Sequence, residues 1–185
     1  MKESRIPPAA EPADGADVAP GLSSPPCYAA EFPGYFGEDA GGPEAPDPLL
    51  IERLNALLEA ERAGARVLAV LRDSLDGRSA ARSLLERLQK DEGANAVLLY
   101  KTIQRLGGVA SHETGAFVQK TLAVEGLAAR LRFVNRGQDW VVRKIVELLP
   151  TVSDPVARAM LEDMRRAHED NIAACEALLA AGHAG

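Results

Sequence analysis

The chain has few of the features that mark several large protein classes. Its 185 residues include two cysteines, Cys27 and Cys175, which are too few for a disulfide framework. No apolar run approaches the roughly 18 residues of a membrane-spanning helix, and the opening MKESRIPPAAEP lacks the apolar core of a signal peptide. The motifs G-x-x-x-x-G-K-[ST], G-x-G-x-x-G, G-x-S-x-G and C-x-x-C are also absent, which excludes most enzyme classes with short signatures. We therefore expect a cytoplasmic protein that does not bind membranes.

A basic surface is missing as well. The net charge is −6, but it is distributed unevenly, with −7 in residues 1–48 and +1 in residues 49–185. Ten of the twelve prolines also lie in residues 1–48. Because binding to nucleic acids requires a clustered basic face, we do not expect a nucleic-acid partner. The acidity belongs to the amino-terminal segment, and the rest of the chain is nearly neutral.

The amino-terminal segment has the composition of a disordered tail. Residues 1–46 are rich in proline, glycine, alanine and acids, and such a segment buries too little apolar surface to offset its ordering entropy. Within it, Cys27–Asp39 contains four of the eight aromatic residues of the chain. This stretch is either an apolar patch that folds back on the rest of the protein or a short motif that orders on contact with a protein partner.

The remaining residues, 47–182, have the pattern of an all-α domain. Apolar residues recur at spacings of three and four, which predicts amphipathic helices that pack at about 20° in a bundle. Asp47-Pro48 and Asp154-Pro155 are typical helix starts, and glycines and Pro150 supply the stops. The helices are expected at 48–75, 79–106, 126–149 and 155–181.

The connection between the second and third helices is longer than the others. Phe117–Val124 has helical character, but a third helix that began at Phe117 would be longer than its partners. We therefore expect residues 117–124 to form part of a crossover packed across the bundle. The alternative is a plain up-down-up-down bundle.

Polar residues interrupt the apolar seam of each helix near its middle. They are Glu61 in the first helix, Glu92 and Asn95 in the second, Gln138 in the third, and His168 and Asn171 in the fourth. Glu61 and Glu92 lie equally far from the turn that joins their helices, so they should face each other. Two facing carboxylates in a dry core would repel, and one would keep its proton. A cation between them removes this conflict.

Four segments resemble the ferritin-like superfamily, and in particular an uncharacterised bacterial branch of it. They are LNALLEAERAGARVL (Leu54–Leu68), DEGAN (Asp91–Asn95), FVNRGQDWVVRK (Phe133–Lys144) and HEDNIAAC (His168–Cys175). The resemblance implies a four-helix ferritin-like bundle with a long crossover, whose inward carboxylates and Glu-x-x-His pairs hold two metal ions. It also implies iron or manganese, a redox-linked role and, by analogy, a homodimer.

The chain departs from that two-metal pattern. Asn95 and Arg165 stand where a histidine and a glutamate are expected, and Gln138 or Asn135 replaces a carboxylate. The residues that remain are Glu61, Glu92 and His168, which could hold one ion of iron, manganese or zinc. Asn95, Gln138 and Asn171 would then be weak or supporting ligands. No catalytic residue follows from the sequence, and whether the protein is an enzyme stays open.

The competing interpretation is a metal-free network of buried hydrogen bonds. In that case Arg62, Arg132, Arg136 or Arg165 would neutralise the two glutamates, and the buried amides would complete the bonds. The bundle would be a non-catalytic scaffold, and the tail segment Cys27–Asp39 would bind the partner. The sequence leaves both hypotheses open.

Overall fold

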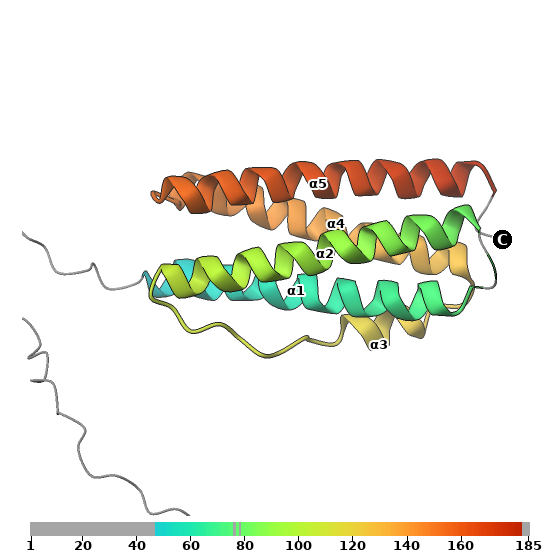
Figure 1. The fold of residues 1–185 in the computed structure, drawn as a ribbon, viewed down its shortest axis with the longest axis horizontal. Helices are drawn as coiled ribbons and strands as arrows, with labels where there is room; N and C mark the ends of the chain where they lie inside the picture. Colours follow the sequence, from blue (N-terminus) through green and yellow to red (C-terminus); the bar gives the residue numbers. More distant parts are fainter. Residues whose placement is uncertain (1–46, 76, 78, 183–185) are drawn as a thin grey trace, which may run out of the picture. The chain divides into compact units, whose positions relative to one another are not determined.

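The computed structural model describes residues 47–75, 77 and 79–182, and its regular structure in these residues is entirely helical (Figure 1). The helices are α1 (Pro48–Asp73), α2 (Ala80–Arg105), α3 (Phe117–Leu122), α4 (Leu127–Leu148), the short 3-10 helix η2 (Leu149–Thr151) and α5 (Pro155–Ala180). In these ranges no helix has the length and hydropathy needed to cross a bilayer. The predicted disordered tail, residues 1–46, and its candidate partner motif Cys27–Asp39 lie outside the described residues and stay predictions.

Helices α1 and α5 begin where the sequence predicts, because the expected side chains cap their amino-terminal ends. Asp47 accepts a hydrogen bond from the amide of Leu49 at 2.9 Å, and Asp154 accepts one from the amide of Ala157 at 2.6 Å. Each cap is followed by proline at the start of its helix. These contacts satisfy amide groups that have no partner within the first turn of a helix.

Two antiparallel hairpins, α1–α2 and α4–α5, build the bundle. Figure 1 shows that the segment after α2 runs back along the bundle through α3, so α4 starts at the same end as α2 and runs in the same direction. The predicted crossover is therefore confirmed, and the alternative of a plain up-down-up-down bundle is wrong. The third helix does begin after the crossover, at Leu127.

Side chains of α1 hold the crossover against the bundle. The Asn55 amide nitrogen donates to the carbonyl of Val109 at 2.9 Å, and its oxygen accepts from the amide of Ser111 at 2.7 Å. The hydroxyl of Ser111 donates to Glu59 at 2.5 Å, and Arg62 donates to the Ser111 carbonyl. These bonds fix the path of the segment that leads to α3.

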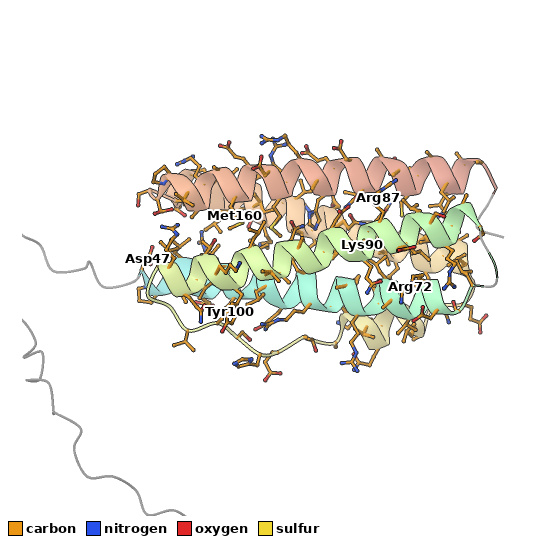
Figure 2. All side chains as sticks on the ribbon, in the orientation of Figure 1. Asp47, Arg72, Arg87, Lys90, Tyr100 and Met160 are labelled. Carbon is orange, nitrogen blue, oxygen red and sulfur yellow. The ribbon has the colours of Figure 1, made fainter. Side chains whose placement is uncertain are left out.

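The interior of the bundle contains two apolar clusters with polar residues between them. The first apolar cluster includes Leu54, Leu57, Leu58, Leu99, Ile103, Val141, Ile145, Leu148, Leu161 and Met164, and Met160 (labelled in Figure 2) packs against it. The second apolar cluster consists of Val67, Leu68, Leu71, Leu84, Leu85, Leu88, Leu131, Val134 and Cys175. The polar layer, as we call the buried polar residues between the clusters, consists of Glu61, Glu92, Asn95, Asn135, Gln138, His168 and Asn171. Each long helix thus contributes to both clusters and to the layer.

Candidate metal centre

Three side chains of the polar layer form a compact group of metal-binding type. Glu61 comes from α1, Glu92 from α2 and His168 from α5, and each is at most 4% exposed. One ligand atom of each residue lies within 4.8 Å of the others. The structure therefore brings together the three residues that the sequence singled out, including the two glutamates expected to face each other.

The imidazole of His168 is oriented by the backbone of its own helix. Its Nδ1 atom lies 3.0 Å from the carbonyl oxygen of Met164, one turn earlier. Because a carbonyl can only accept a hydrogen bond, Nδ1 carries a proton, and in the neutral imidazole Nε2 presents a lone pair to the polar layer. A second nitrogen fixed in this way is a common feature of metal-binding histidines.

The free nitrogen of His168 faces a carboxylate. His168 Nε2 lies 3.1 Å from Glu61 Oε1, but the contact lacks hydrogen-bond geometry. Both atoms are buried and have no hydrogen-bond partner in the described residues. Two electron-rich atoms thus meet in the core, and either a proton or a cation must lie between them.

The other oxygen of Glu61 is held by Asn95. The amide nitrogen of Asn95 donates to Glu61 Oε2 at 3.1 Å across the α1–α2 hairpin. Asn95 stands where the two-metal pattern requires a histidine, and here it is a donor that orients a carboxylate. Its contact leaves Oε1 of Glu61 directed to His168.

Glu92 reaches the layer because α1 has no side chain opposite it. A Cβ atom added at Gly64 would lie 2.7 Å from Glu92 Cδ and 3.1 Å from Glu92 Oε1, which is closer than ordinary contact. Gly64 lies one turn after Glu61, in the apolar seam of α1. The one signal in the sequence for the close approach of Glu92 to α1 is a glycine, Gly64, at a position of the apolar seam that faces a glutamate.

The layer disfavours negative charge on Glu92 in the absence of a cation. Burial, followed by the negative charge of Glu61, raises the pKa of Glu92 well above its usual value. Burial lowers the pKa of His168, but the negative charge of the neighbouring Glu61 carboxylate outweighs this effect and raises the pKa. A proton on Glu92 is therefore favoured when no cation lies in the layer.

The arginines that would neutralise the glutamates in a metal-free network lie elsewhere. Arg62 contacts the crossover, Arg165 pairs with Glu169 at 2.6 Å, and the guanidinium of Arg136 lies 4.9 Å from the ring centre of Phe133. Within residues 47–182 as described, neither these three nor Arg132 forms an ion pair with Glu61 or Glu92. That part of the metal-free interpretation is wrong.

The remaining candidate ligands occupy the layer in different ways. Gln138 is 3% exposed, and neither atom of its amide has a hydrogen-bond partner in the described part of the chain. Asn171 is buried on α5, one turn after His168. Asn135, the alternative to Gln138 at the position of a carboxylate, donates its amide nitrogen to the carbonyl of Ile172 at 3.3 Å. Arg165, which stands in place of a glutamate, pairs with Glu169 instead of entering the layer. The neutral amides do not supply the carboxylates that a second metal ion would require.

A pocket of about 470 Å³ connects the polar layer with the surface. It lies between α1, the segment around α3, and α4, and Glu92, Gln138 and His168 line its inner part. The space exists because the facing residues of α1 are small, including Ala60, Ala63 and Gly64. The buried group is therefore accessible to small molecules.

The helical bundle with its crossover has a ferritin-like fold. The solved structure of a dodecameric thioferritin, the bacterioferritin-related protein from Bacteroides fragilis, is similar with a TM-score of 0.60 and 15% identity. The match covers 71% of this chain and 84% of that one, and at this identity it shows the fold. Residues 49–177 match a family described as a domain of unknown function, DUF6306, and the chain belongs to that family. No curated protein matches the sequence.

Proposed function

We propose that this protein binds one divalent transition-metal ion, iron or manganese, between Glu61, Glu92 and His168, and that the ion has a redox-linked role. The observation that carries this proposal is the contact of His168 Nε2 with Glu61 Oε1 in a fully buried layer, where neither atom has a hydrogen-bond partner among the described residues. An ion between them would use both lone pairs and neutralise the two carboxylates.

The donor set fits such an ion. An imidazole nitrogen and two carboxylates suit iron, manganese and zinc, and the two negative charges balance one divalent cation. When bound, iron or manganese would supply one-electron chemistry and Lewis acidity. The chain supports the donors from behind, since the Met164 carbonyl holds His168 and Asn95 holds Glu61. Gly64 leaves room for Glu92.

The second candidate function is a non-catalytic interaction scaffold without a metal. The hydrogen bond from Asn95 to Glu61 favours it, because this bond also belongs to a metal-free network. In this proposal Glu92 keeps its proton, and the tail segment Cys27–Asp39 binds a protein partner. Deletion of residues 1–46 should then abolish capture of that partner, and unchanged capture would contradict the tail motif.

The metal content of the purified protein separates the two proposals. Protein expressed with added iron and manganese should contain about one ion per chain, measured by plasma mass spectrometry. Glu61→Gln, Glu92→Gln and His168→Gln should each lose the ion. The matched control is Glu86→Gln on α2, because Glu86 is exposed and pairs with Lys90.

Two results would contradict the metal proposal. One is folded wild-type protein that contains fewer than about 0.1 ion per chain after growth with both metals. The other is equal loss of metal from Glu92→Gln and from the control Glu86→Gln, which would indicate adventitious surface binding.

A further inference from the structure

The pocket beside the polar layer is shaped for an organic molecule. Its volume of about 470 Å³ lies within the roughly 300–1,000 Å³ of small-molecule sites. Small residues of α1, such as Ala60 and Ala63, form one wall, and three aromatic residues, Phe117, Phe133 and Trp140, line the opposite side. An aromatic wall facing a wall of small residues leaves a space suited to a planar apolar group.

The aromatic wall is built by close packing. The rings of Phe117 and Phe133 are stacked, with centroids 5.5 Å apart. Phe117 reaches this position over Gly137, where an added Cβ would lie 2.6 Å from Phe117 Cζ. The wall thus depends on the crossover helix α3 lying against α4, and it is part of the folded structure before any ligand binds.

The inner part of the pocket contains an amide with no partner. Gln138 is almost completely buried, and both its Nε2 and its Oε1 lack a hydrogen-bond partner in the described residues. Leaving such a group unpaired costs free energy. Since Gln138 lines the pocket, a ligand with a hydroxyl group could accept from its nitrogen or donate to its oxygen.

Charge differs between the two ends of the pocket. Lys120 and Arg136 are exposed and line it at the surface, and the cation of Arg136 lies over the ring of Phe133. Glu59 also lines the pocket, but its carboxylate already accepts a hydrogen bond from Ser111. At the inner end lies Glu92, beside Glu61. An anionic group is therefore favoured at the surface and disfavoured inside.

We propose that the pocket binds a small aromatic carboxylic acid with a hydroxyl group opposite its carboxylate. The carboxylate pairs with Arg136 and Lys120, the ring lies against the aromatic wall, and the hydroxyl group bonds to Gln138. The inference goes beyond the proposed metal site and does not depend on it, because the proposed ion is held by Glu61, Glu92 and His168; of the groups used here, only Gln138 is a candidate supporting ligand.

Calorimetry on the full chain, stripped of metal with a chelator, tests the proposal with 4-hydroxybenzoate as the probe. Benzoate lacks the hydroxyl group and 4-hydroxybenzyl alcohol lacks the carboxylate, so each should bind about tenfold more weakly. Binding should also quench the fluorescence of Trp140, the single tryptophan of the chain, which lines the pocket.

Substitutions test which residue causes the preference for the hydroxyl group and which causes the preference for the carboxylate. Gln138→Leu should bind 4-hydroxybenzoate and benzoate equally, because it removes the amide that distinguishes them. Lys120→Gln combined with Arg136→Gln should remove the preference over 4-hydroxybenzyl alcohol. Lys101→Gln, at an exposed position of α2 away from the pocket, is the control and should retain both preferences.

The proposal is overturned if 4-hydroxybenzoate does not bind at up to about 10 mM, the weak limit for a ligand of this size. It is also overturned if Gln138→Leu keeps the full preference for the hydroxyl group. Metal content is measured on the same preparations before the chelator is added. Binding of the probe to protein that never takes up metal would support the pocket and contradict the metal site, so the two failures are distinguishable.

Discussion

The two apolar clusters and the polar layer between them are built from the same four helices, yet they differ in how their side chains are satisfied. The clusters consist of leucine, isoleucine, valine and other apolar side chains that are nearly all inaccessible to solvent. Every buried side-chain nitrogen or oxygen atom that lacks a hydrogen-bond partner in the described residues belongs to the layer. These atoms are in Glu61, Asn135, Gln138 and His168. The unsatisfied groups are concentrated at the level of the layer in α1, α4 and α5.

This difference assigns stability to the apolar clusters and binding to the polar layer. Each buried leucine stabilises the fold by about 1.5–3 kcal/mol, and each unpaired buried polar group costs about 1–3 kcal/mol. The apolar clusters at the two ends of the bundle therefore stabilise the fold, and the polar layer destabilises it. A layer that lowers stability is explained if its groups are partners for an ion or a ligand.

The largest expected effect comes from the apolar clusters. Leu99→Ala in the first cluster and Leu85→Ala in the second should each lower the free energy of unfolding by about 2–5 kcal/mol, because both side chains are fully buried. Urea denaturation in the presence of a chelator measures this change. Metal content per folded chain should stay the same. A loss below about 1 kcal/mol at both sites would show that the ends do not carry the stability.

Gly64→Ala should damage the layer without replacing any of the three proposed ion ligands. The new methyl group would overlap the carboxylate of Glu92, so the free energy of unfolding should fall by about 1–3 kcal/mol and metal content should decrease. Gly93→Ala on α2 is the matched control, because an added Cβ there meets nothing within 4 Å. The control should gain about 0.5–1 kcal/mol from the higher helix propensity of alanine. Equal effects at both glycines would contradict the close approach at Gly64.

The helices and the facing glutamates could be predicted because they depend on local signals. The caps Asp47 and Asp154 mark helix starts, and equal distances from a tight turn place Glu61 opposite Glu92. The neutralising arginines were predicted wrongly because neighbours on a helix point about 100° apart. Arg62 follows Glu61 directly and reaches the crossover instead of the layer.

The pocket could not be predicted from periodicity, since it depends on how distant segments pack. Phe117 of the crossover fills the space over Gly137 in α4, and no spacing rule connects these two positions. The unpaired amide of Gln138 is also a property of the assembled layer: the sequence marked the residue as buried and polar, but its lack of a partner follows only from the positions of all neighbouring groups.

Glu92→Gln should have a smaller effect that depends on pH. The pKa of Glu92 is raised in the folded protein, so above the ordinary value of 4.5 the unfolded chain releases a proton that the folded chain keeps. Metal-free wild-type protein therefore loses stability as the pH rises through this window. The variant, which has no proton to lose, should match the wild type near pH 4 and be more stable near pH 8, by on the order of 1 kcal/mol. Equal pH dependence of the two proteins would contradict a buried, protonated Glu92.

Asp154→Asn should have the smallest effect, in a different pH range. Asp154 pairs with Arg105 through contacts of 2.6 and 2.8 Å and caps α5, and these bonds lower its pKa to about 2. A lowered pKa in the folded state gives stability that is present above the unfolded value of 3.8 and is lost as the pH falls toward about 2. Asparagine keeps the cap but not the charge, so the variant should lose about 0.5 kcal/mol at neutral pH and nothing near pH 2. The ion pair at the end of the bundle titrates below pH 4, and Glu92 titrates above it. Denaturation measured across both pH ranges therefore separates the contribution of the bundle surface from that of the polar layer. An equal loss of unfolding free energy below pH 4 in the wild type and in Asp154→Asn would contradict this separation.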